Sequence, residues 1–177
     1  YAAIAADSRA NAQNNEMAIF YGKPASVEEV LASPMVASPL HLFEIVMPVA
    51  GADAVIVTTA EKAAGLRHPP VFLNGAGEKI THRAVSQAPS LTSGPLKPSM
   101  ARALAQAGMH VRDINFLSFY DCYTIMVATT IEDAGLCGAG KFGEWLRDNG
   151  GMSADACQPI NTHGGQLGFG QPDLAGG

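Results

Sequence analysis

The sequence predicts an α/β fold in which helices cover a sheet. Three observations favour this class. From residue 51 onward, patterns typical of strands alternate with patterns typical of helices. Apolar residues make up 47% of the chain and charged residues only 15%, against a usual charged share of about 25%. The chain has 177 residues, which is enough for one ordinary domain with the buried core that such a composition requires.

Two helices are expected in the first part of the chain. Residues 1–13 consist mostly of helix-favouring residues, with apolar side chains on one face. A loop follows over residues 14–25. Ser26 and Glu29 then form a capping-box sequence, which predicts a short helix to about Leu31.

A strand, a helix and a second strand are expected next. Residues 51–59 combine small and β-branched residues, as buried strands do. Thr58 and Glu61 form a second capping-box sequence, which predicts a helix over residues 59–65. Residues 71–81 are rich in apolar residues around a glycine kink and are expected to form another strand.

The rest of the chain alternates in the same way. Residues 82–96 form a polar loop that is longer than a simple connection needs. Beyond it, Pro98 and Gly108 are typical of the beginning and the end of a helix. The expected elements are helices over 98–107, 121–134 and 142–148, and strands over 114–119 and 159–162.

Charge and cysteine usage exclude several classes of protein. Eleven basic and 16 acidic residues give a net charge of −5, which offers no basic patch for nucleic acid or an anionic membrane. No apolar run approaches the ~18 residues of a membrane span. Cys122, Cys137 and Cys157 form no CxxC pair and, being three, no disulfide framework. We therefore expect a protein of the reducing cytoplasm.

The first candidate site is the sequence Phe-Tyr-Asp-Cys-Tyr-Thr over residues 119–124, between a predicted strand and a predicted helix. Ligands bind at the carboxyl ends of strands in open α/β sheets, and a helix N-terminus favours negative charge. Tyr120 and Asp121 can transfer protons or form hydrogen bonds there. The structural alternative, which the spacing alone favours, is that Asp121 caps the helix and Tyr120 is a half-buried aromatic. Cys122 is expected to be buried rather than reactive.

The second candidate site is the sequence Asn-Thr-His-Gly-Gly over residues 161–165. His163 follows a short predicted strand, and Gly164 and Gly165 let a ligand approach the backbone closely. The alternative is a structural histidine that hydrogen-bonds a loop. The glycines do not match GxGxxG after a strand, so a nucleotide-binding loop is not expected.

The other histidines give no metal site. His82 opens the long polar loop, where pocket and surface placements are equally compatible with the sequence. No pair of histidines has metal-ligand spacing, so the sequence predicts no metal. Three histidines in turn or strand contexts are expected on the surface: His41, His68 and His110.

With both motifs in place, the sequence resembles the thiolase superfamily, in its sterol-carrier-protein-thiolase-like branch. Thiolases consist of two similar halves, with CoA and the acyl chain between them. Residues 1–68 resemble the end of the first half, and residues 69–177 resemble most of the second half. The resemblance implies a thiolase-like fold of helix-covered mixed sheets. Because the chain begins on Tyr1 inside a helical pattern and stops at Gly177, we expect an excerpt of a longer protein.

Compared motif by motif, the resemblance implies roles for single residues. Tyr120 falls where the family has an Asn or His that helps to hold the thioester oxygen. His163 replaces an Asn, and Gln171 replaces the His that activates the nucleophilic Cys in true thiolases. A glutamine amide cannot take up a proton near pH 7, so the usual Cys–His pairing for an acyl-enzyme is broken.

The altered motifs are similar to those of thiolase-like aldolases of steroid side-chain breakdown. This implies retro-aldol cleavage of a 3-hydroxyacyl-CoA, with Tyr120 and His163 as base, acid or enolate donor. Asp121 would orient the turn or a neighbouring donor. Two alternatives stay open: Claisen-type acyl transfer by a thiolase, and a non-catalytic lipid or acyl-CoA carrier.

The resemblance also implies ligands and partners. Coenzyme A would enter as part of the substrate, with no further cofactor. A homodimer is expected, and a small OB-fold and zinc-ribbon acyl-CoA-binding protein is a possible partner by family analogy. The residues expected near the pantetheine and the ligand backbone are Ser86, Gln87, Ser93, Gly164 and Gly165.

Overall fold

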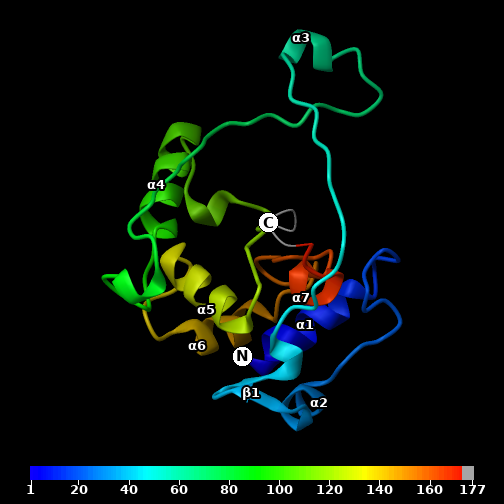
Figure 1. The fold of residues 1–177 in the computed structure, drawn as a ribbon. Coiled ribbons are helices and arrows are strands. Elements are labelled where there is room, and N and C mark those ends of the chain that lie inside the picture. The colour runs from blue at the N-terminus through cyan, green and yellow to red at the C-terminus, as the bar shows by residue number, and fades with distance from the viewer. Residues whose placement is uncertain (173–177) are drawn as a thin grey trace.

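Helices form the packed centre of the molecule. The computed structural model describes residues 1–172 (Figure 1). Helix α1 (Ala2–Ala12) and helix α7 (Gly165–Phe169) come from distant parts of the chain and pack side by side. Helix α5 (Thr124–Asp133) contacts α1, and helix α6 (Phe142–Asn149) packs against α5.

An apolar core lies among these helices. The side chains of Ile4, Val127, Ile131, Met152 and Ile160 are fully buried in it. Burying an aliphatic side chain of this size stabilises the fold by roughly 1.5–3 kcal/mol. The core therefore joins α1 and α5 to the segment that leads into α7. Within residues 1–172, no helix is long and apolar enough to cross a membrane.

The contact between α1 and α7 depends on small residues. A Cβ atom at Gly168 would lie 2.5 Å from the carbonyl oxygen of Ser8 and 2.9 Å from the Cβ of Ala12. The glycine lets the two helices approach more closely than any side chain would. On the same helix, the buried Asn11 amide donates to three backbone carbonyls, those of Met152, Ile160 and Asn161.

The local signals for helices are confirmed with small shifts in the ends. Helix α2 (Val27–Ala32) begins with the predicted capping box, in which Ser26 Oγ accepts from Glu29 N–H at 3.2 Å and Glu29 Oε2 accepts from Ser26 N–H at 2.7 Å. Helix α4 (Leu96–Ala107) begins two residues before the predicted start and ends at Gly108, whose φ is +65°. Helix α3 (Ala60–Ala63) is shorter than expected. The predicted capping box of Thr58 and Glu61 is wrong, because the N-cap is Thr59 and its side chain makes no cap hydrogen bond.

The predicted strands, in contrast, do not assemble into a sheet among residues 1–172. The one β-ladder there is an antiparallel hairpin of β1 (Met35–Ala37) and β2 (Leu40–His41). The segments 51–59 and 71–81 run unpaired. A strand requires a neighbour to pair its N–H and C=O groups, and neither segment has one in the described part of the chain.

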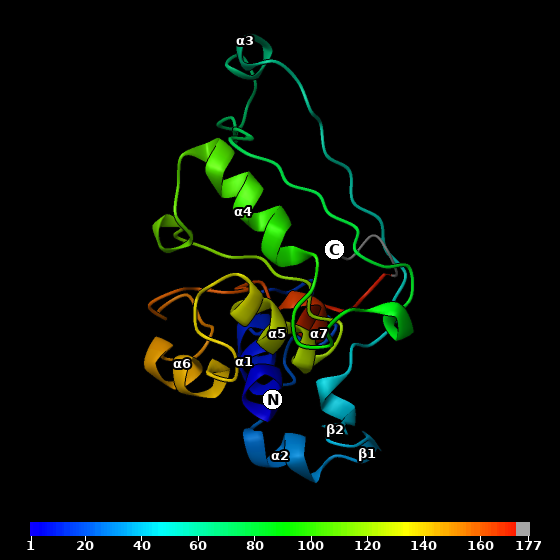
Figure 2. The same ribbon diagram turned by 90° about the vertical axis from the view of Figure 1, so that its left-hand side faces the viewer.

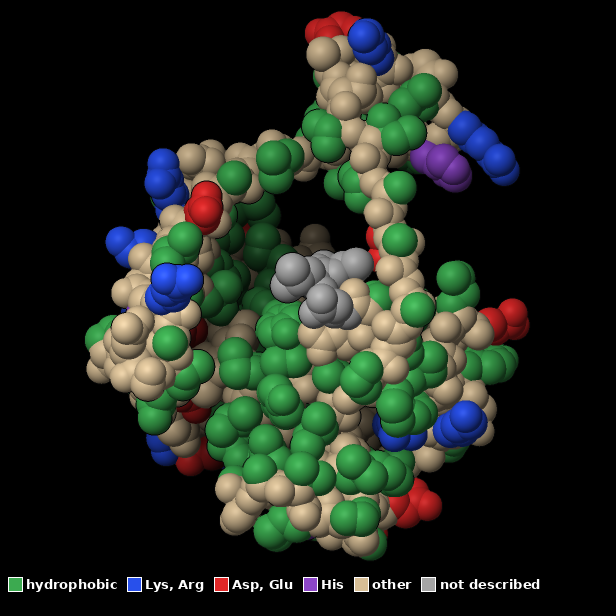
Figure 3. Space-filling model, in the orientation of Figure 1, with side chains coloured by type: hydrophobic (Ala, Val, Ile, Leu, Met, Phe, Trp, Pro, Cys, Tyr) green, Lys and Arg blue, Asp and Glu red, His purple; other side chains and the backbone are tan. Residues whose placement is uncertain are grey.

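Residues 50–74 form an arm that leaves the body and carries α3 at its far end (Figures 1 and 2). Its apolar side chains face solvent (Figure 3): Val55, Ile56 and Val57 are 86%, 86% and 91% exposed. The arm is therefore an exposed apolar surface.

Beyond the arm the chain returns along α4. There a Cβ at Gly77 would lie 1.8 Å from the Ser99 carbonyl oxygen, so only glycine lets the chain run this close to the helix.

We expect the chain of residues 1–177 to self-associate in isolation, because water is a poor solvent for a contiguous apolar arm. Light scattering after size exclusion should give a mass above that of one chain. The double variant Val55→Lys, Val57→Lys should shift the mass towards the monomer. As a control, Ala101→Lys with Ala105→Lys adds the same charge to exposed positions of α4. A monomeric wild-type chain would contradict the expectation.

Candidate active site

The candidate site forms where residues 117–123 meet residues 159–166. The backbone N–H of Leu117 donates to the Pro159 carbonyl at 3.0 Å, and that of Asn161 donates to the Leu117 carbonyl at 3.0 Å. Leu117 and Ile160 form a single parallel bridge. This bridge is what remains of the two strands predicted over 114–119 and 159–162. It brings the two sequence motifs together.

Beyond the bridge, the side chain of Asn161 continues the contact. Its Oδ1 accepts from Phe119 N–H at 2.8 Å, and its Nδ2 donates to the Phe119 carbonyl at 2.9 Å. The side chain is fully buried, and its residue has a φ of +48°, a left-handed conformation that asparagine tolerates better than most residues. We call this pair of hydrogen bonds the Asn161 clamp. The clamp was not predicted from the sequence, although Asn161 lies in the second candidate motif.

The carboxylate of Asp121 serves the start of α7. Its two oxygens accept from the backbone N–H groups of Gln166 at 2.8 Å and Leu167 at 3.3 Å. Asp121 thus caps a helix, as the structural alternative predicted. The capped helix is α7, however, and not the helix that follows Asp121 in the chain. Burial raises the pKa of Asp121, while the two N–H donors and His163 oppose that rise. Its catalytic role stays a prediction.

Gly164 and Gly165 allow close contacts within the protein. Their φ angles are +113° and +59°. A Cβ at Gly165 would lie 2.0 Å from Asp121 Oδ2, and a Cβ at Gly164 would lie 3.0 Å from the Cβ of Ala12. Both glycines are therefore required by the capping of α7 and by its packing on α1. A contact with a ligand stays a prediction.

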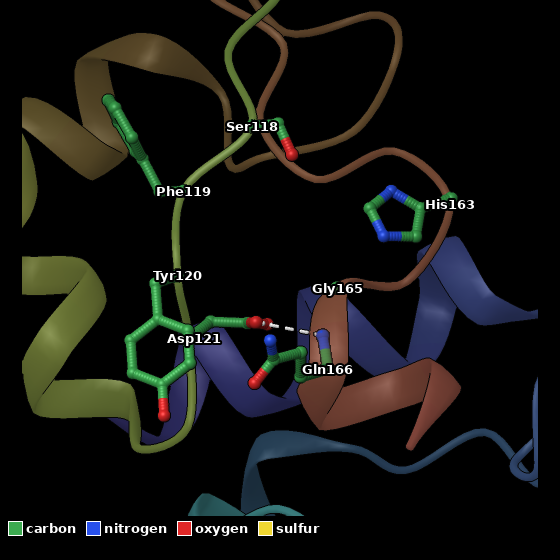
Figure 4. Close-up of a pocket in the computed structure, with 7 residues that line it drawn as sticks. All are labelled: Ser118, Phe119, Tyr120, Asp121, His163, Gly165 and Gln166. Carbon is green, nitrogen blue, oxygen red and sulfur yellow. Dashed lines mark hydrogen bonds between the residues drawn. The ribbon is translucent and has the colours of Figure 1, made fainter. Parts of the chain in front are cut away.

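A pocket enclosing about 290 Å³, part of it open to solvent, lies over this junction (Figure 4). Figure 4 shows the His163 imidazole and the Ser118 hydroxyl on one side of the segment from Phe119 to Asp121, and the Tyr120 phenol on the other. Sequence reasoning expected Tyr120 and His163 to face one pocket. Both residues contribute to its lining, but their side chains point apart. The lining residues are Ser118, Phe119, Tyr120, Asp121, His163, Gly165 and Gln166.

The Tyr120 phenol lies beside Gln171 and Cys122. The Gln171 side-chain amide donates from Nε2 to the phenol oxygen at 3.0 Å. A hydrogen bond with Cys122 raises the pKa of Tyr120, burial adds to the rise, and the Gln171 donor opposes it. Cys122 is half-buried, and burial raises the pKa of its thiol. The thiol is therefore not activated as a nucleophile.

Residues 45–49 hold both partners of this contact. Val46 N–H donates to the Cys122 carbonyl at 3.1 Å, and Gln171 N–H donates to the Met47 carbonyl at 2.9 Å. Val49 N–H donates to the Gln171 carbonyl at 3.1 Å. The sequence predicts no element for this segment, because its pairing partners lie more than 70 residues away along the chain.

The loop residues expected near pantetheine, Ser86, Gln87 and Ser93, are not among those that line the pocket. Ser86 and Gln87 are exposed in the short 3₁₀-helix η2 (Val85–Gln87). Ser93 donates from Oγ to Asp133 Oδ1 at 2.7 Å, which ties the end of the long loop to α5. Their contact with CoA stays a prediction.

One histidine is not where the sequence predicted. His41 is largely buried, because its Nδ1 and its backbone N–H both lie against the buried Glu44 carboxylate, at 3.2 and 2.7 Å. His68 and His110 are exposed, as expected, and His82 pairs with Thr81 Oγ1 at 2.8 Å. Over the described residues, no three His, Cys, Asp or Glu side chains gather as metal ligands would.

Comparisons with known proteins support the resemblance. The family model described as thiolase C-terminal domain-like matches residues 77–176. The 17-hydroxy-3-oxo-4-pregnene-20-carboxyl-CoA lyase of Mycobacterium tuberculosis is 33% identical over 173 residues, covering 95% of this chain and 45% of that protein. The steroid side-chain-cleaving aldolase of Thermomonospora curvata is 31% identical over 170 residues, covering 93% of this chain and 43% of that protein.

Among solved structures, the Ltp2-ChsH2(DUF35) aldolase aligns with a TM-score of 0.82 and 26% identity, over 96% of this chain and 45% of that chain. The predicted thiolase-like fold is confirmed by these matches. The chain spans about half the length of the curated relatives it matches.

We expect Asn161→Ala to lower the free energy of unfolding by about 3 kcal/mol, because each unpaired group left at Phe119 costs roughly 1–3 kcal/mol. Urea unfolding monitored by circular dichroism measures the change, with an unchanged m-value as evidence that the mechanism is still two-state. The exposed Asn14→Ala is the control and should change stability by less than about 0.5 kcal/mol. Equal effects of the two substitutions would show that the Asn161 clamp contributes nothing.

Proposed function

The chain belongs to the thiolase C-terminal domain-like family, and on that premise we propose that the protein cleaves a carbon–carbon bond of a CoA thioester by a retro-aldol reaction. The substrate class is a 3-hydroxyacyl-CoA that carries a steroid or other lipid side chain. One observation carries the proposal: the Gln171 amide donates to the Tyr120 phenol at 3.0 Å, where true thiolases have a His that activates the nucleophilic Cys. The relatives named as a lyase and an aldolase, 33% and 31% identical, support it.

The reaction needs a base and a donor at two different atoms. A base removes the proton of the 3-hydroxyl, the C2–C3 bond breaks, and C3 leaves as a carbonyl. The electron pair of that bond passes into the thioester enolate, which hydrogen-bond donors hold until C2 takes up a proton. No acyl-enzyme is formed in this sequence of steps.

The chemistry of each side chain supports one division of these roles. An unperturbed phenol has a pKa near ~10, and the contact with Cys122 raises the pKa of Tyr120 further, so Tyr120 stays protonated near neutral pH. It therefore suits the thioester or enolate oxygen as a donor. A neutral imidazole has a ring nitrogen that can accept a proton, so His163 suits the base. Their placement on opposite sides of the segment from Phe119 to Asp121 is compatible with two different target atoms.

Acyl transfer of the thiolase type is the alternative, and two features of the structure weigh against it. Gln171 cannot take a proton from a thiol. Cys122 does not replace the missing pair, because burial raises the pKa of its thiol. The carrier alternative leaves the Tyr120–Gln171 contact without a purpose.

The proposal extends to ligands, partners and place. It includes an acyl-CoA as the substrate, no cofactor beyond the CoA of that substrate, a homodimer and a cytoplasmic location. It also includes a small OB-fold and zinc-ribbon acyl-CoA-binding partner. The paired name of the Ltp2-ChsH2(DUF35) aldolase supports a partner protein as such. Residues 1–68 and 69–177 are assigned to two similar halves.

We expect Tyr120→Phe and His163→Ala each to lower the rate of 3-hydroxyacyl-CoA cleavage by about 10²–10⁴-fold, the usual cost of losing an acid–base group. Binding of the CoA ester, measured by calorimetry, should change little. Tyr21→Phe and His68→Ala are the matched controls and should keep the wild-type rate, since Tyr21 and His68 are both exposed and lie outside the pocket lining. A normal rate in Tyr120→Phe would make Tyr120 a packing residue. A loss of binding in both variants would favour the carrier.

We also expect no acyl-enzyme to accumulate. Intact mass after incubation with an acyl-CoA should equal the mass of the unmodified protein, and Cys122→Ser should behave in the same way. A stable adduct of one acyl group on a cysteine would restore the thiolase alternative and contradict the retro-aldol proposal.

A further inference from the structure

We propose that Gln171 is a positioning residue for Tyr120: its amide N–H holds the phenol oxygen, so that the phenol proton stays available to the substrate. The inference rests on the function proposed above, because it assigns to Tyr120 the role of a donor. It gives a purpose to the residue that replaces the His of true thiolases.

The direction of the hydrogen bond matters here. Because Gln171 Nε2 donates, the phenol oxygen is the acceptor and its own proton is not used in this contact. The Cys122 thiol is the other neighbour of the phenol. A sulfur atom is a weak acceptor, so an enolate or thioester oxygen would compete with it successfully for the phenol proton.

The backbone of Gln171 is held firmly enough to aim the side chain. Its N–H and its C=O pair with Met47 and Val49. The preceding residue, Gly170, has a φ of +109°, and a Cβ there would lie 2.8 Å from Val49 Cγ1. The chain therefore takes a tight path that only glycine allows, immediately before the glutamine.

The same segment also holds the other side of the contact. Ile45 forms an antiparallel bridge with Tyr123, and Val46 donates to the Cys122 carbonyl. The residues of the thiol and the amide are thus attached to one short stretch of chain, residues 45–49, and the phenol contacts both groups. A change in that stretch would move all three groups together.

Tyr120 needs such a partner because its side chain is 47% exposed. Unless a hydrogen bond fixes it, a phenol at this exposure can rotate, and water competes for its hydroxyl group. A fixed donor costs less reorganisation when negative charge develops on the substrate oxygen. Gln171 supplies the fixing contact without adding a charge that would oppose the enolate.

Three substitutions of Gln171 separate the possible roles. Gln171→Met keeps the length of the side chain and removes the donor. Gln171→Glu keeps the length and replaces the donor by a carboxylate, which accepts the phenol proton. Gln171→His restores an N–H donor. Gln106→Met is the matched control, because Gln106 is an exposed glutamine on α4, away from the site, whose Oε1 accepts from Ala76 N–H.

The first measurement is the titration of the phenol itself, which does not depend on catalysis. Tyrosine labelled with ¹³C at Cζ is followed by NMR in the protein, and Tyr120→Phe identifies the signal. Donation by an amide stabilises the phenolate, so Gln171→Met should raise the pKa of Tyr120. Gln171→Glu should raise it further, Gln171→His should restore the wild-type titration, and Gln106→Met should leave it unchanged.

The second measurement is the cleavage rate. Gln171→Met should lower kcat roughly 3- to 10-fold, the effect of one hydrogen bond of ordinary net strength, with KM unchanged. Gln171→Glu should lower kcat more, and Gln171→His should recover most of it. The alkaline limb of the pH–rate profile should move with the phenol titration in each variant.

The outcomes distinguish this inference from the proposed function. An unchanged phenol titration in Gln171→Met would overturn the inference whatever the rates are. A shifted titration with a normal kcat, in a protein in which Tyr120→Phe is slow, would overturn the positioning role alone. A normal rate in Tyr120→Phe would overturn the proposed function and the positioning role with it, even where the titration demonstrates the hydrogen bond.

Discussion

The candidate site depends on the Asn161 clamp, the two hydrogen bonds between the Asn161 side chain and the backbone of Phe119. They continue a parallel contact that would otherwise end at Leu117 and Ile160. Tyr120 and His163 each lie within two residues of the clamp, so the clamp positions the backbone from which both side chains project. A buried amide with both partners present is stable, and a buried amide with one partner missing is costly.

A second buried polar group carries this geometry into the core. The Asp121 carboxylate caps α7 and leaves no room for a Cβ at Gly165. Helix α7 in turn packs on α1 through Gly168. The floor of the pocket is therefore continuous with the α1–α7 contact, and a side chain added at any of these glycines would disturb both. Asp121 and Gly165 therefore both line the pocket and hold α7 in place.

The neighbours of the Tyr120 phenol, the proposed donor, are held by a different part of the chain. Residues 45–49, from the first part of the chain, hold Cys122 and Gln171 by backbone hydrogen bonds. A phenol whose pKa is raised, next to an amide that cannot accept a proton near neutral pH, is suited to donation rather than to nucleophilic activation. This chemistry distinguishes the proposed retro-aldol cleavage from acyl transfer, and the same fold could support either.

The sequence alone determined α1, α2, α4, α5 and α6 to within about three residues at each end, since a helix and its caps depend on contacts within about four residues. The capping box of Ser26 and Glu29 and the helix end at Gly108 are examples. Helix α7 was not predicted. The sequence also predicted two motifs as the candidate site, and the structure brings them together at one pocket. Only the tertiary structure decided that Asp121 caps α7, that Gln171 meets Tyr120 and that Tyr120 and His163 point apart. These contacts join residues more than 40 positions apart, and the segments 51–59 and 71–81 show the same limit: a strand-like pattern becomes a strand only where a distant segment pairs with it.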